Sequence, residues 1–143
     1  MTAKQLTVFI ENRKGRLGEI LDVLKQGDVN ILSLSLADTA EYGLFRLIVD
    51  DPAKGKEKLS AAGFSCMVTD VFLVKVPHTP GSLQNILKII SDAEINIEYM
   101  YGLSVGGRDA SIVVKPSDAE SACKVFGEKG IDTLTAAELK ELF

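Results

Sequence analysis

The sequence is poor in residues that build metal and redox sites: its 143 residues include one histidine and two cysteines. Structural zinc sites use four cysteine or histidine ligands, so His78, Cys66 and Cys123 are too few for one. We expect no metal and no cofactor. The cysteines lie far apart in apolar surroundings and form no Cys-x-x-Cys pair. We therefore expect buried, reduced thiols, because disulfides are rare in the cytosol.

Long apolar runs and an excess of basic residues are also missing. The longest apolar stretches, around Val71–Val76 and Ile86–Ile90, are far shorter than the roughly 20 residues that span a bilayer, and no basic-then-apolar leader opens the chain. Sixteen Lys and Arg against twenty Asp and Glu give a net charge of −4, whereas nucleic-acid-binding proteins usually carry a basic face. We expect a cytoplasmic protein with no nucleic-acid or membrane partner. One local cluster, Arg13, Lys14 and Arg16, could still hold a single anion.

Sequence motifs for catalysis are missing too. The chain has no Gly-x-Ser-x-Gly, P-loop, His-Glu-x-x-His or Gly-x-Gly-x-x-Gly motif. A nucleophile activated by His78 would need Ser82 or Cys66 nearby and an orienting acid, and the spacing does not favour that arrangement. We expect a non-catalytic protein.

The chain contains an internal repeat. Residues Gly15–Leu21 match Gly81–Leu87 at a shift of 66 (81 − 15), and the same shift pairs Asn30-Ile31 with Asn96-Ile97. Matches at Gly and Asn, besides Leu and Ile, are not expected from two amphipathic helices aligned by chance. We expect two copies of one unit, and we place the domains at residues 1–69 and 70–143, the second with a short C-terminal helix.

Each copy is predicted to have the order strand, helix, strand, strand, helix, strand. β-rich or alternating segments predict the strands, and apolar residues at i, i+3, i+4 and i+7 predict the helices. The leucines of residues 32–36 alternate with Ser33 and Ser35, which predicts one buried strand face. Ser117 is expected to cap a helix, and Thr135 with Glu138 to cap a tail helix that runs to Phe143. The predicted strands are 6–10, 32–36, 44–49, 66–76, 95–104, 110–115 and 131–135.

This order predicts an α+β fold, a ferredoxin-like βαββαβ two-layer sandwich in two tandem copies with antiparallel sheets. Residues 66–76 are too long for one short strand, so we expect them to close the first copy and open the second. A unit of about 66 residues has a small core. Neighbouring units are therefore expected to complete it.

The loop before the first helix of each copy is the strongest candidate for a ligand site. Gly15 and Gly81 let a ligand approach the backbone closely, and the unpaired N–H groups of a helix start favour a carboxylate. Asn12 and His78 can donate or accept, and so can the asparagines after each helix. A free amino acid needs such a set of donors and acceptors. The alternative is that the glycines only form tight turns and the asparagines only cap helix ends.

These motifs resemble a known family. The order Asn-x-x-Gly-x-Leu, about a dozen helical residues, then Asn-Ile opening a strand resembles the ACT domain, a small amino-acid-sensing module. The first copy, with Glu11-Asn12-Arg13-x-Gly15-x-Leu17 and Asn30-Ile31-x-Ser33-Leu34, is most similar to the ACT domain of the small regulatory subunit of acetolactate synthase. The second copy, with Thr79-Pro80-Gly81-Ser82-Leu83, resembles a second ACT domain.

The resemblance implies a regulatory protein that binds a free amino acid at the interface between ACT units. The ligand would lie between the loop before the first helix and the second strand of a neighbouring unit. Lys14 replaces a proline common in the motif, and His78 stands where Asn or Asp is usual, which puts the second site in doubt. The implied ligand-binding residues are Asn12, Arg13, Lys14, Gly15, Arg16, Leu17, Asn30, Ile31, His78, Thr79, Pro80, Gly81, Ser82, Leu83, Asn96 and Ile97.

ACT domains normally accompany a catalytic domain, and we expect none here. That predicts a homodimer or larger assembly that senses an amino acid and acts on a metabolic enzyme in trans. The alternatives are a regulatory subunit of a separate amino-acid-biosynthesis enzyme and an interaction module without a ligand. An RNA-binding module would need stacking aromatics on its central strands. Tyr99 and Tyr101 are candidates, but the first copy has Ser33 and Ser35 there. For the ligand, Arg13 or Arg16 favours an acidic group and the leucines an apolar side chain.

Overall fold

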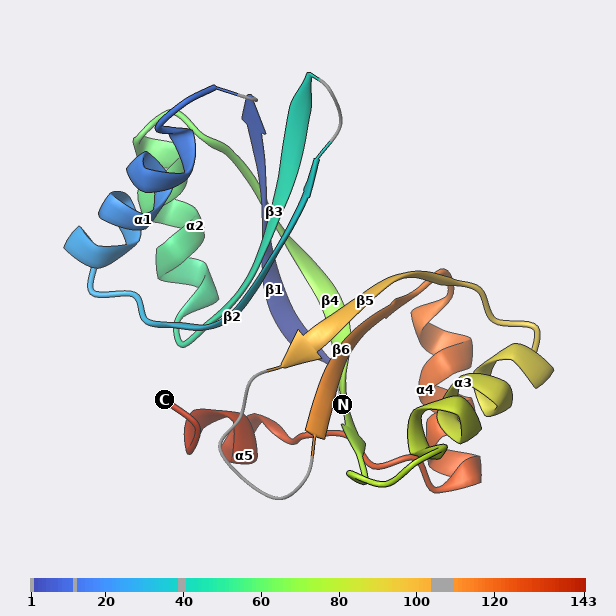
Figure 1. The fold of residues 1–143 in the computed structure, drawn as a ribbon. Coiled ribbons are helices and arrows are strands. Elements are labelled where there is room, and N and C mark those ends of the chain that lie inside the picture. Colours follow the sequence, from blue (N-terminus) through green and yellow to red (C-terminus); the bar gives the residue numbers. More distant parts are fainter. Residues whose placement is uncertain (1, 12, 39–40, 104–109) are drawn as a thin grey trace. The chain divides into compact units, whose positions relative to one another are not determined.

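The computed structural model describes residues 2–11, 13–38, 41–103 and 110–143 (Figure 1). They form two compact units, an N-terminal unit built from Lys4–Thr69 and a C-terminal unit built from Asp70–Leu142. The elements are β1 (Ala3–Glu11), α1 (Arg16–Gln26), β2 (Ile31–Asp38), β3 (Tyr42–Val49), α2 (Pro52–Ala61), β4 (Ser65–Val76), α3 (Ser82–Asp92), β5 (Ile97–Leu103), β6 (Ala110–Pro116), α4 (Ala119–Lys129) and α5 (Ala136–Lys140).

Each unit has two layers, with α1 and α2 on one face of the strands of the first unit and α3 and α4 on one face of those of the second (Figure 1). In the N-terminal unit the strand order is β2-β3-β1-β4, and in the C-terminal unit it is β4-β6-β5. The pairs β1–β3, β2–β3, β4–β6 and β5–β6 are antiparallel. The predicted α+β, ferredoxin-like fold in two tandem copies is confirmed. β4 is a single 12-residue strand that belongs to both units.

The last strand of the second copy is reduced to one bridge. Thr133 pairs with Val74, and the N–H of Leu134 donates to the carbonyl of Leu73 at 2.8 Å. The predicted capping box of Thr135 and Glu138 is present, but its helix α5 ends at Lys140. The Lys75 ammonium contacts Glu138 at 2.6 Å. The hydrogen bond from that ammonium lowers the pKa of Glu138 and fixes the tail to β4.

The two copies repeat each other down to backbone angles. Asp28 and Glu94, 66 residues apart (94 − 28), end α1 and α3 with φ of 56° and 59°. The second helices are capped by Asp51 and Asp118, which are 67 apart (118 − 51) and accept from the N–H groups of Lys54 and Ser121. The second copy therefore holds one extra residue before this cap.

The expectation that Ser117 caps α4 is wrong. Because of the extra residue, the N–H of Ser117 donates to the carbonyl of Asn96 at 2.8 Å, and the cap falls on Asp118. Hydrogen bonds from the Ser121 side chain and backbone lower the pKa of Asp118.

Each unit has its own apolar core between helices and strands. In the C-terminal unit the rings of Phe72 and Phe126 meet edge to face, with centroids 5.0 Å apart. The N-terminal core comprises Leu6, Val8, Ile10, Ile20, Leu24, Val29, Phe45, Leu47, Val49, Leu59 and Phe64. The C-terminal core comprises Phe72, Val74, Val76, Ile86, Ile90, Ile95, Val114, Ala122 and Phe126.

The leucines of β2 are not buried, which contradicts the predicted buried leucine face. Leu34 and Leu36 lie opposite Leu47 and Phe45, so they are on the core side of the sheet. They are nevertheless 52% and 44% exposed, because β2 is the last strand in the order and the two helices pack over its neighbours. Ser33, by contrast, is buried.

Replacing either of two glycines within helices by alanine is expected to have opposite effects on stability. A Cβ atom at Gly55 of α2 would lie 2.7 Å from Cδ1 of the buried Leu6, whereas one at Gly18 of α1 has nothing within 4 Å. We expect Gly55→Ala to lower the free energy of unfolding by about 1 kcal/mol or more through overpacking. We expect Gly18→Ala to raise it by about 0.5–1 kcal/mol through helix propensity. Urea unfolding of both variants checks this; a stabilised Gly55→Ala would contradict the packing.

Candidate functional site

The loops before α1 and α3 have the same backbone. Gly15 and Gly81 precede the helices with φ of 89° and 84°, a left-handed conformation that favours glycine. The N–H of Glu19 donates to the carbonyl of Gly15 at 3.1 Å, and the N–H of Asn85 donates to that of Gly81 at 3.0 Å. The turn therefore requires glycine at both positions, whether or not a ligand binds there.

The two helix starts also share an open first turn. Within the described part of the chain, no side chain accepts a hydrogen bond from the first N–H groups of α1 or α3, unlike α2 and α4, which Asp51 and Asp118 cap. The N–H groups of Arg16 and Ser82 donate to loop carbonyls, so the open positions are the next two N–H groups of each helix. Unpaired N–H groups and the helix dipole give such a turn a partial positive charge. A ligand carboxylate fits this environment.

In the C-terminal unit this loop borders a hollow of about 590 Å³, here called the loop hollow. His78, Thr79 and Pro80 form its exposed rim. Ser82 is not among its lining residues; the Ser82 and Thr79 hydroxyls are hydrogen-bonded to each other. The loop hollow is lined by Val76, Pro77, His78, Thr79, Pro80, Gly81, Leu83, Gln84, Ala110 and Ile112. The structure thus brings five of the six predicted loop residues of the second copy together.

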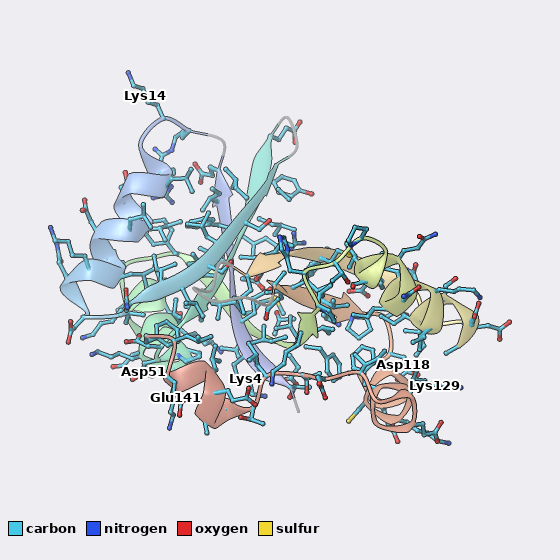
Figure 2. All side chains as sticks on the ribbon, turned by 60° about the horizontal axis from the view of Figure 1, so that its bottom comes forward. Lys4, Lys14, Asp51, Asp118, Lys129 and Glu141 are labelled. Carbon is cyan, nitrogen blue, oxygen red and sulfur yellow. The ribbon has the colours of Figure 1, made fainter. Side chains whose placement is uncertain are left out.

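In the N-terminal unit the basic loop is largely paired with its own acids. Arg13 Nε lies 3.2 Å from a Glu11 carboxylate oxygen, and Arg16 Nη1 lies 2.7 Å from one of Glu19. The Lys14 side chain points away from the ribbon (Figure 2). Asn12 lies outside the described residues. Arg13 and Arg16 of the expected anion-binding cluster therefore each have one nitrogen paired with a neighbouring carboxylate.

Asn30 lies beyond the other end of α1 from Gly15, about 16 Å along an 11-residue helix. Its N–H donates to Asp50 Oδ1 at 2.9 Å, and its side-chain oxygen accepts from the N–H of Ile31 at 3.0 Å. Asn96 is placed alike, and its carbonyl accepts from the N–H of Ser117. Asn30 and Ile31 line a separate groove of about 530 Å³ beside α1. Within one unit, the structure does not bring the strand-start residues to the loop.

One cluster was missed by the sequence analysis. The Arg16 guanidinium lies 4.5 Å above the centre of the Phe64 ring and lines a hollow of about 480 Å³ with Phe9 and Tyr42. These side chains come from four separate segments of the chain. Their proximity depends on strand pairing, and no local sequence pattern signals it.

The cysteines are free and half-buried rather than fully buried. Burial raises the pKa of the Cys66 thiol to about 11, with a smaller opposing effect of Lys56. Such a thiol is protonated at neutral pH and is not a nucleophile. Among the described residues, no three His, Cys, Asp or Glu side chains cluster as metal ligands, and no helix is long and apolar enough to cross a membrane.

Comparisons with known proteins agree with this architecture. A family model described as "ACT domain pair" matches residues 1–143. The crystal structure of protein BT0572 from Bacteroides thetaiotaomicron is 37% identical, with a TM-score of 0.91, covering 99% of this chain and 98% of that chain. The regulatory subunit of aspartate kinase from Thermus thermophilus is 14% identical, with a TM-score of 0.61 over 87% and 91% of the chains, and shares the fold. No curated protein matches.

The raised pKa of Cys66 predicts slow alkylation. In a Cys123→Ser background, we expect iodoacetamide at pH 8 to react with Cys66 at least about tenfold more slowly than in the urea-unfolded chain, because the thiolate is the reactive form. The folded-state rate should rise as the pH approaches 11. Equal rates for the folded and unfolded chains would show that burial does not suppress the thiolate.

Proposed function

This chain belongs to the ACT domain pair family, and on that premise we propose that it is a non-catalytic regulatory protein that binds a free amino acid in the loop hollow. ACT domain pairs are regulatory modules, typical of amino-acid-binding regulatory proteins. The 37% identity to BT0572 over nearly the whole of both chains supports the same architecture for this chain. We also place the protein in the cytoplasm.

The observation that carries the proposal is the open first turn of α3 beside the loop hollow. The N–H groups of Leu83 and Gln84 would hold the ligand carboxylate, since that of Ser82 donates to the carbonyl of Thr79 and no side chain among the described residues caps the turn. His78 and Thr79 on the rim offer polar atoms for the ammonium group. Val76, Ala110 and Ile112 supply apolar surface for a small or branched side chain. His78 in place of Asn or Asp is therefore compatible with a working site.

A neighbouring copy of the chain is proposed to complete the assembly. β2 is the last strand of its sheet order, so one of its edges is open to pairing. Leu34 and Leu36 add exposed apolar surface along that edge, and residues 31–37 carry no charge. β5 is less suitable, because Glu98 on it contacts Lys115. A homodimer paired through β2 would bury the leucines that the helices leave exposed.

Regulation then follows from differential affinity. A ligand that binds one conformation or assembly more tightly shifts the population toward it by that difference in affinity. A metabolic enzyme recognised in trans by one of these states would sense the amino acid. A regulatory subunit that pairs its β2 edge with a separate biosynthetic enzyme is the second candidate, because the same neutral edge fits a strand of another protein.

Calorimetric titration with the twenty amino acids, pooled and then split, tests ligand binding. We expect one class to bind and Gly81→Val to weaken it at least tenfold, because a β-branched residue disfavours the left-handed turn and fills the approach to the backbone. Gly15→Val reports on the first copy in the same way. Gly130→Val is the matched control: Gly130 also has positive φ but does not line the loop hollow. Equal losses in Gly81→Val and Gly130→Val would indicate misfolding; no heat with any pool would refute the sensor.

Sedimentation velocity tests the β2 edge. We expect the wild-type chain to be a dimer at high micromolar concentration and Leu34→Lys to be a monomer, since a charge on an edge strand blocks pairing. Met100→Lys, at the equivalent position of β5, should leave the dimer intact. Dissociation by Met100→Lys alone would place the interface on β5, and a monomeric wild type would contradict self-association through either edge.

A further inference from the structure

We infer that the N-terminal unit holds a second ligand site, here called the Arg16 hollow, that binds an aromatic α-amino acid through its carboxylate. The inference rests on the proposed function, because it names the amino-acid class and adds a site distinct from the loop hollow. The Arg16 hollow is lined by Phe9, Ile10, Glu11, Arg16, Tyr42, Gly63, Phe64 and Ser65, and its volume is about 480 Å³. All of these residues belong to the N-terminal unit.

Arg16 is held in place on two sides. Its guanidinium lies over the Phe64 ring, and its Nη1 is bonded to Glu19. Its Nε is buried and has no hydrogen-bond acceptor among the residues that the structure describes, and a buried donor without an acceptor is unfavourable. A guanidinium pairs with a carboxylate through two parallel hydrogen bonds. A ligand carboxylate is therefore the group that would complete the bonding of Arg16.

The walls of the hollow favour a flat apolar side chain. Phe9 and Tyr42 are 44% and 52% exposed, and their strand partners Leu44 and Glu11 place them on the face of the β1–β3 pair opposite the core residue Ile10. Phe64 follows the turn that joins α2 to β4, at the same end of the unit as the start of α1 (Figure 1). Aromatic rings pair favourably with one another in stacked or edge-to-face contacts. The Phe64 ring under the guanidinium and the two exposed rings that line the same hollow offer apolar surface to an aromatic acid.

A carboxylate in the same hollow can bind the ammonium group of the ligand. Glu11 is a lining residue, and its carboxylate faces Arg13 at 3.2 Å on an exposed surface. An α-ammonium group can share that carboxylate, because an ionised carboxylate accepts more than one hydrogen bond. One base, one acid and three rings together match a zwitterion that carries an aromatic side chain.

The C-terminal unit provides a natural comparison. A hollow of about 330 Å³ lies at the equivalent place, with Lys75, Ser82 and Ile131 where the first copy has Phe9, Arg16 and Phe64. The fold therefore creates a depression between the start of the first helix and the end of the second in both copies. The guanidinium and the rings are present in the first copy alone, so the aromatic specificity is assigned to Arg16 and its neighbours.

The test uses the full-length chain and L-phenylalanine as the probe, titrated by calorimetry. We expect L-phenylalanine to bind, Arg16→Met to weaken it at least tenfold, and Lys25→Met to change it less than twofold. Lys25 is the matched control because it lies in the last turn of the same helix, loses the same charge and does not line the hollow. L-phenylalaninamide lacks the carboxylate. It should bind the wild type and Arg16→Met equally weakly, because the substitution and the amide each remove the same interaction, that between Arg16 and the ligand carboxylate.

The possible outcomes separate this inference from the proposed function. L-phenylalanine binding that survives Arg16→Met, falls equally in Lys25→Met, or disappears in Gly81→Val would overturn the Arg16 hollow and leave the amino-acid sensor standing. Binding of another amino acid but not of L-phenylalanine would do the same. If no amino acid binds, the proposed function and this inference fail together. Phe64→Leu, which removes the stacked ring and keeps an apolar side chain, should weaken L-phenylalanine more than it weakens L-leucine if the inference is correct.

Discussion

Two helices of 10 or 11 residues cannot cover every strand of the layer beneath them, and much of this structure follows from that limit. In the N-terminal unit the core is drawn mainly from β1 and β3, where Leu6, Val8, Phe45 and Leu47 are buried against α1 and α2. Leu34 and Leu36 of β2 point to the same side and remain exposed. The apolar surface that could bind partners is therefore located where helix coverage ends.

Features that depend on residues close together in the chain could be predicted from the sequence, and features that depend on strand order could not. Local signals gave the helix starts, the capping box of Thr135 and Glu138 and the turn glycines, because each depends on residues a few positions apart. The burial of Leu34 was mispredicted because alternation fixes the face of a strand but not its place in the strand order. Ser117 was mispredicted because one extra residue moved the cap to Asp118, and the repeat alone did not reveal that residue.

The candidate sites also differ in how far apart their residues lie in the sequence. The Gly81 loop was visible in the sequence because its residues are consecutive, and five of them line one hollow. Arg16 was visible as a base but not as the partner of Phe64, which is 48 residues away (64 − 16) and reaches it through the α2–β4 turn. Asn30 was predicted as a ligand-binding residue, yet its backbone N–H bonds to Asp50 before α2 and so ties the end of α1 to that segment. In this position it has a structural role whether or not a neighbour's ligand also reaches it.

Duplication has kept the backbone of the unit and changed its side chains. Gly15 and Gly81 have nearly the same φ, and the hydrogen bonds of the two loops agree within about 0.1 Å. The side chains on this common frame differ in charge and shape: Arg16 over an aromatic ring in one copy, Ser82 bonded to Thr79 in the other. Because a helix start without a cap attracts any carboxylate, discrimination between amino acids has to come from these variable side chains. If both proposals hold, one amino acid binds at the start of α3 and another on the Arg16 guanidinium, and the chain responds to two amino acids through one fold.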